Sequence, residues 1–120
     1  MRFAIKLILA VLWTAFIVYA LLSEPSAVPK YPWLKFPGVD KLIHAILFVA
    51  ESFLLVWSFS DHRIRVTALL SVFWCFILGG GLELAQHYYV EGRSGDLLDL
   101  GADLLGAVIG VILVAKWMKK

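Results

Sequence analysis

The residues of this chain that can do chemistry lie along helix-like faces inside long apolar stretches. The first such face carries Asp40, His44, Phe48 and Glu51, whose spacing of four, four and three residues places them on one side of a helix. An imidazole changes its charge near neutral pH, and a nearby carboxylate can orient it or exchange a proton with it. Such a combination is typical of general acid–base chemistry.

Two later segments supply further polar side chains. Glu83, Gln86 and His87 lie together near the end of the next apolar stretch, and Arg93 follows in a loop. The last apolar stretch has one face of acids followed by glycines, namely Asp96, Asp99, Asp103, Gly106 and Gly110. Glycines on a helix face let a neighbouring helix approach closely. We therefore expect polar groups from three segments to meet in one leaflet of a membrane.

Four acids fall within apolar stretches: Glu51, Glu83, Asp99 and Asp103. A carboxylate near the centre of a bilayer costs about 2.5–3.5 kcal/mol, so four facing lipid would cost on the order of 10 kcal/mol. These side chains must face one another, the bundle interior or a water-filled cavity. They outnumber the nearby cations Lys41 and Arg93, so either some carboxyls are protonated or a cation visits the site.

Several of these residues also fit purely structural roles. Asp40 and Lys41 fit a helix cap at the membrane interface, and Asp96 fits the first turn of a helix. His87 lies beside two tyrosines and fits an interfacial position, and Glu51 fits a protonated hydrogen-bond donor. The strongest site candidates are those that converge from separate segments: His44, Glu83, Arg93 and Asp99.

The elements that carry these residues are predicted to be transmembrane helices. Hydrophobic residues make up 62% of the 120 residues, against roughly 45–50% in soluble domains. A membrane span needs about 20 mostly apolar residues, and the stretches at about 3–22, 41–59, 64–90 and 97–117 qualify. We predict an all-α integral membrane bundle of four transmembrane helices in one domain, residues 1–120. The first stretch is too long for a signal peptide, so we expect a retained helix.

Basic residues predict the orientation of the bundle. One side would hold Arg2, Lys6, Arg63, Arg65, Lys116, Lys119 and Lys120, and the other Lys30, Lys35, Lys41 and Arg93. Both termini are therefore expected in the cytoplasm, with the polar site facing the extracytoplasmic side. Trp57 and Trp117 would then lie at the inner interface, and Trp33, Tyr88 and Tyr89 at the outer one. Cys75 is expected to be a buried, inert thiol, and the net charge of +2 does not suggest a nucleic-acid partner.

The order and spacing of the polar residues resemble those of the VanZ-like family of small bacterial membrane proteins. The shared pattern is Asp40-Lys41-x-x-His44-x-x-x-Phe48, Glu83-x-x-Gln86, then Arg93, Asp99, Asp103, Gly106 and Gly110. That family also has a four-helix core and takes its name from a protein associated with teicoplanin resistance. Two departures are Asp103, where the family more often carries Asn, and Glu51, at a position that tends to be apolar or small.

The resemblance implies an enzyme of lipid headgroups or lipid-carrier phosphates in the bacterial cytoplasmic membrane. Its partner would be a membrane lipid or a lipid-linked envelope precursor at the outer leaflet. His44 would act as general base or nucleophile, and Glu83 or Asp99 would orient it. The remaining positions would bind substrate: Asp40, Lys41, Gln86, Arg93 and Asp103. Whether the protein is an enzyme, and its oligomeric state, stay open.

Two other functions fit the sequence. The segment with Pro25, Pro29, Pro32 and Pro37 is interleaved with aromatic residues, which would suit a non-enzymatic envelope binder or an antibiotic-tolerance protein. A proton-coupled transporter is the third hypothesis, and it depends on Glu51. No cofactor is predicted. A metal site stays open, because Asp40, His44, Glu83 and Asp99 could offer oxygen and nitrogen ligands. It is not among the predicted sites, since no Cys/His spacing specific for metals supports it.

Overall fold

The computed structural model describes residues 3–22, 39–59, 63–89 and 97–118. They form four helices, α1 (Phe3–Leu22), α2 (Val39–Ser58), α3 (Ile64–Tyr89) and α4 (Leu97–Met118), and no strand occurs within these ranges. Each helix is long and apolar enough to cross a membrane. The predicted all-α bundle of four membrane-length helices is therefore confirmed.

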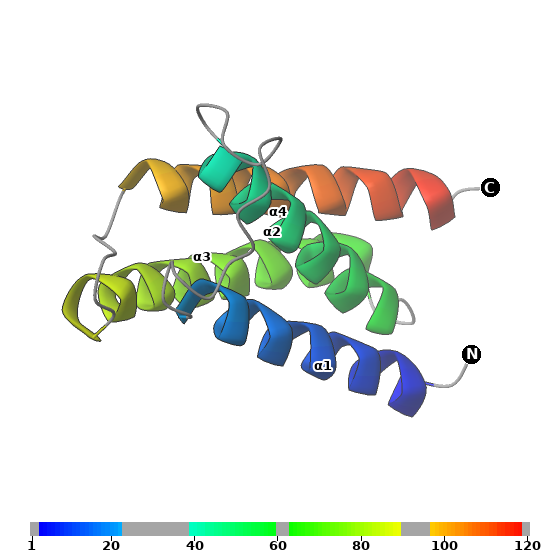
Figure 1. Ribbon diagram of the computed structural model, residues 1–120. Coiled ribbons are helices and arrows are strands. Elements are labelled where there is room, and N and C mark those ends of the chain that lie inside the picture. The colour runs from blue at the N-terminus through cyan, green and yellow to red at the C-terminus, as the bar shows by residue number, and fades with distance from the viewer. Residues whose placement is uncertain (1–2, 23–38, 60–62, 90–96, 119–120) are drawn as a thin grey trace.

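The helices form a bundle in which α2 occupies the centre. It packs most extensively against α4 and also contacts α1 and α3, while α3 packs against α4 as well. Figure 1 shows α2 crossing α4 at an angle, with the start of α1 and the end of α4 at the same end of the bundle. Side chains of α2 are thus positioned to meet those of every other helix.

Two glycines explain the close contact between α2 and α4. A Cβ atom added to Gly106 would collide with the backbone of Ala45, and one added to Gly110 would collide with Ser52 Oγ and the Val49 carbonyl. Only a glycine lets the two backbones come this close. The packing role that the sequence predicted for this glycine pair is confirmed.

The distribution of side chains is that of a membrane protein, with polar groups inside and apolar groups outside. Buried polar residues in the described helices include His44, Glu51, Glu83, Gln86, Asp99 and Asp103. Large apolar side chains cover the outer faces, as Leu69 does at 72% exposure. The acids of the spans therefore face the bundle interior, as their cost in lipid requires. Cys75 is fully buried too, as expected.

The three consecutive glycines of α3 do not break that helix, which is continuous from Ile64 to Tyr89. Gly79 makes a close helix contact, because a Cβ there would lie 2.7 Å from Oδ2 of Asp103. No atom of the described residues lies within 4 Å of a Cβ added to Gly80 or Gly81. The missing side chain of Gly79 therefore lets α3 pack closely against α4.

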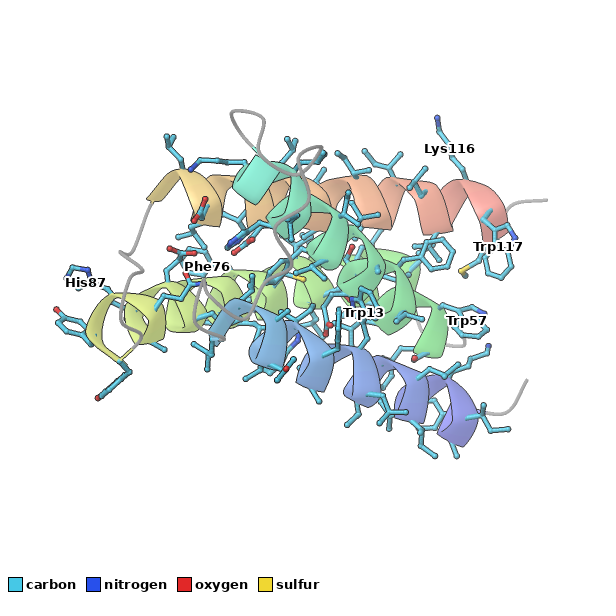
Figure 2. The ribbon with its side chains drawn as sticks, in the orientation of Figure 1. Trp13, Trp57, Phe76, His87, Lys116 and Trp117 are labelled. Carbon is cyan, nitrogen blue, oxygen red and sulfur yellow. The ribbon has the colours of Figure 1, made fainter. Side chains whose placement is uncertain are left out.

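Aromatic residues lie at both ends of the bundle. Figure 2 places Trp57 and Trp117 at one end and His87 at the other. The rings of Trp57 and Trp117 are 6.4 Å apart between centroids, and Lys6 Nζ lies 5.0 Å from the Trp57 ring. His87 packs edge-on against exposed Tyr88. Such aromatic belts are usual where a bundle meets the two membrane surfaces.

Candidate functional site

The imidazole of His44 lies at the junction of α2 and α4. Its Nδ1 is 2.8 Å from Oδ1 of Asp103. Both residues are buried, with His44 3% exposed and Asp103 0% exposed. Ala45, the next residue of α2, rests against Gly106, three residues after Asp103. The glycine contact thus fixes the separation at which the imidazole and the carboxylate can meet.

Asp99 lies one helical turn before Asp103 and reaches the other nitrogen of the ring. Its Oδ2 is 3.7 Å from Nε2 of His44, a distance that fits an ion pair but is too long for a hydrogen bond. Its Oδ1 is 3.2 Å from Nζ of Lys41. The Lys41 side chain is 40% exposed, compared with 12% for that of Asp99. Lys41 therefore stands at the outer edge of the site, and the imidazole lies deeper.

Helix α3 contributes Glu83. Its Oε1 lies 3.9 Å from Nδ1 of His44, and the residue is 7% exposed. Gly79 precedes Glu83 by one turn and, having no side chain, leaves room for the carboxylate of Asp103. Three carboxylates from two helices consequently surround a single imidazole.

Gln86 lies on the same helix but turns to α1. Its Nε2 donates a hydrogen bond to the carbonyl oxygen of Leu21 at 2.5 Å, and the residue is 2% exposed. Leu21 belongs to the last turn of α1, where carbonyl groups have no partner within the helix. Gln86 thus ties α3 to the end of α1, and its predicted contact with substrate stays a prediction.

The remaining predicted site residues fall outside the described part of the chain. Arg93 and Asp96 lie between α3 and α4 in a range that the structure does not describe, and the side chain of Asp40 is likewise outside it. The site residues that the structure brings together are Lys41, His44, Glu83, Asp99 and Asp103.

Comparison with known proteins now identifies the family. The profile of the VanZ/LLP1 family matches residues 3–118. The chain belongs to this family. An uncharacterised protein of Schizosaccharomyces pombe is 31% identical over 122 residues, which cover 100% of this chain and 70% of that protein. No solved structure matches the chain.

The yeast relative bears on the expected location. VanZ/LLP1 membership and the four membrane-length helices establish a multi-pass membrane protein of this family. A relative in a eukaryote means that the resemblance to small bacterial proteins does not fix the organism or the membrane. The bacterial cytoplasmic membrane and the outward-facing site therefore remain proposals for this VanZ/LLP1 chain.

Within this VanZ/LLP1 bundle, the hydrogen-bond partner of His44 differs from the sequence-based interpretation. The sequence assigned the orientation of the imidazole to Glu83 or Asp99 and placed Asp103 among the substrate-binding residues. In the structure the carboxylate oxygen nearest to a ring nitrogen of His44 belongs to Asp103, at 2.8 Å. The corresponding distances are 3.7 Å for Asp99 and 3.9 Å for Glu83. The sequence does contain one indication of this pairing. Asp103 lies three residues before Gly106, the glycine at which α4 comes close to the backbone of α2.

Glu51 forms a second polar cluster deeper in the bundle, and two of its residues were not predicted. Its Oε1 accepts hydrogen bonds from Thr14 Oγ1 at 2.6 Å and from Trp74 Nε1 at 3.2 Å. Glu51 is fully buried. These bonds join α1 and α3 to α2, which favours the structural interpretation of Glu51. A lone threonine or tryptophan in an apolar span carries no signal that would reveal this contact in the sequence.

The arrangement around His44 suits proton transfer. When Nδ1 carries the proton, it donates to Asp103 and leaves Nε2 as a base on the side of Asp99 and Lys41. An orienting carboxylate of this kind fixes the tautomer and stabilises the imidazolium once it forms. A cation at the outer edge of the site would attract an anionic group toward that base.

Proposed function

We propose that this VanZ/LLP1 protein cleaves or transfers a phosphoester in the headgroup of a membrane lipid or a lipid-linked envelope precursor. The observation that carries the proposal is the buried pair of His44 and Asp103, with Lys41 at the outer edge of the same site. A base held by a carboxylate, next to a cation, is what phosphoester hydrolysis requires.

The reaction follows from these positions. Nε2 of His44 takes a proton from water, or from an acceptor hydroxyl, as its oxygen forms a new bond to phosphorus. The ester P–O bond breaks, and the imidazolium returns the proton to the leaving alkoxide. Asp103 stabilises the imidazolium in between. Lys41 neutralises charge on the phosphate, and Arg93 is expected to do the same from the loop after α3.

The apolar part of such a substrate has a place along the bundle. A groove beside α1 and α2 is lined by apolar side chains: Trp13, Ile46, Val49, Ala50, Phe53 and Leu54. Ile46 lies on α2 two residues after His44, so the two side chains belong to different faces of that helix, with Ile46 exposed and His44 buried. The spans lie in lipid, and an acyl or prenyl chain is the occupant that such a groove would accept. This arrangement favours a lipid-linked substrate over a water-soluble one.

The alternatives have less support. An envelope binder would depend on the proline-rich aromatic segment, which lies outside the described residues. A proton-coupled transporter would depend on Glu51, whose bonds to Thr14 and Trp74 favour a structural role. We further propose that the site faces the extracytoplasmic leaflet, on the basis of the distribution of basic residues.

The experiment replaces His44, Glu83 and Arg93 singly and compares membrane lipids by mass spectrometry. Substrate lipids should accumulate in the His44→Gln strain, with turnover lower by about 100-fold to 10,000-fold, the usual contribution of a general base. The matched control is Glu51→Gln, a change of another fully buried acid on the same helix, which should leave the lipids unchanged. Unchanged lipids in all three site variants, at normal protein levels, contradict the enzyme hypothesis.

A further inference from the structure

We propose that His44, Glu83 and Asp103 bind a divalent transition-metal ion between α2, α3 and α4. One ligand atom from each residue lies within 4.8 Å of the other two. Ligand atoms on one tetrahedral ion, at bonds of about 2.0–2.2 Å, lie about 3.3–3.6 Å apart. To share a single ion, the three ligand atoms would move closer together by up to about 1.5 Å. The three residues are 3%, 7% and 0% exposed, so the site is enclosed by protein.

An independent observation comes from Asp103. Its Oδ2 is buried and has no hydrogen-bond partner among the described residues. This oxygen faces α3 at Gly79, one turn before Glu83. A buried carboxylate oxygen without a donor is costly in a membrane, and a metal bond would satisfy it.

The charges of the site match a dication. Asp99 is paired with Lys41, which offsets one of the three carboxylates around His44. The charges of Glu83 and Asp103 together equal that of one divalent ion, and neutral imidazole adds no charge to the balance. An ion of this charge would make the enclosed cluster neutral, the favourable state inside a bilayer.

The surroundings of His44 also suit a metal ligand. With Nδ1 on the ion, Nε2 carries the proton and faces Oδ2 of Asp99 at 3.7 Å. Histidine ligands usually donate their other N–H to a carboxylate, which fixes the ring and raises its basicity. Asp99 is itself held by Lys41 at 3.2 Å. Asp99 would become the outer partner of His44 once this 3.7 Å separation shortens to hydrogen-bond length.

The donor set indicates the class of ion. Imidazole favours Zn²⁺ and its neighbours, while carboxylates also accept Mn²⁺, so one nitrogen with two carboxylates suits a first-row divalent ion. The ion would replace the imidazole as activator of the attacking water in the proposed reaction. Treatment with the chelator EDTA distinguishes the proposed function from the proposed metal site. Turnover that requires His44 but persists in EDTA supports the function and contradicts the metal site.

The direct test is binding to the purified full-length chain in lipid nanodiscs. After treatment with EDTA, the protein is dialysed against Zn²⁺ or Mn²⁺, and the bound metal is measured by inductively coupled plasma mass spectrometry. We expect one ion per wild-type chain. Glu83→Gln and Asp103→Asn should each weaken binding by on the order of 100-fold or more, and Asp99→Asn by about 10-fold to 100-fold, as for other outer partners.

Two control variants make the result specific. Glu51→Gln removes a different fully buried acid and should keep the ion. His87→Ala removes an exposed histidine and should also keep it. A wild-type chain without stoichiometric metal, or equal binding by wild type, Glu83→Gln and Asp103→Asn, overturns the proposal. The wild-type measurement alone can reject the metal site, so the test remains decisive even if a variant fails to fold.

Discussion

Nδ1 of His44 lies 2.8 Å from Oδ1 of Asp103, a contact that joins α2 to α4 inside the bundle. It depends on backbone proximity, because Gly106 lets α4 approach Ala45, the neighbour of His44. The geometry of the His44 site therefore depends directly on how closely α2 and α4 pack. Changes that push the helices apart should disturb the site even when no polar residue is altered.

The first prediction concerns this packing. Gly106→Ala adds a Cβ that collides with the Ala45 backbone, which cannot move aside as a flexible side chain would. We expect a loss of about 1–3 kcal/mol in stability, the usual cost of overpacking, measured by unfolding in mixed detergent micelles. Gly101→Ala, on the same helix, has no described atom within 4 Å of the added Cβ and should be neutral or stabilising by up to about 1 kcal/mol. Equal stability of the two variants would refute the packing role.

Lys41 is predicted to act on substrate binding more than on the chemical step. Lys41→Gln removes the cation 3.2 Å from Asp99 at the outer edge of the site. KM for an anionic lipid should rise roughly tenfold, as for loss of about 1.4 kcal/mol of binding, while kcat changes less. Lys116→Gln is the matched control, since Figure 2 places Lys116 at the opposite end of the bundle. A pure loss of kcat in Lys41→Gln would assign this residue to the reaction step.

Much of the fold could be predicted from the sequence, because a membrane demands long apolar helices and penalises carboxylates that face lipid. Those two constraints predicted four helices and the inward orientation of Glu51, Glu83, Asp99 and Asp103, all of which the structure confirms. The pairing within the site was less predictable. Which acid approaches His44 most closely depends on the crossing of α2 and α4, and periodicity along one helix contains no information about that crossing.

The same limit applies to hydrogen bonds across the bundle. Gln86 has the spacing of a site residue, yet it donates to Leu21 in α1, a helix that the sequence treated as a plain span. Thr14 is a similar case, because only the packing of α1 against α2 brings it to Glu51. Contacts between distant segments follow from tertiary packing, which a single sequence does not specify.

The third prediction concerns the contact between Thr14 and Glu51. Thr14→Val keeps the shape of the side chain and removes the hydroxyl that donates to Oε1 at 2.6 Å. Hydrogen bonds between membrane helices contribute about 0.6 kcal/mol on average and up to about 1.7 kcal/mol. We expect a destabilisation in this range in the same unfolding assay, with lipid turnover retained. Thr67→Val is a suitable control, because among the described residues its hydroxyl donates to Arg63 of its own segment. A loss of turnover without loss of stability would instead give Glu51 a direct part in function.

The fourth prediction tests the side of the membrane on which the site lies. Tyr89 is 87% exposed at the end of α3, in the half of that helix that carries Glu83. Trp117 is 49% exposed near the end of α4, at the opposite end of the bundle. The natural thiol, Cys75, is fully buried and should give little background labelling. In intact cells, a membrane-impermeant maleimide should label Tyr89→Cys at once and Trp117→Cys only after permeabilisation, as the basic residues predict. The reverse pattern would place the His44 site at the cytoplasmic leaflet and restrict its substrates to lipids of that leaflet.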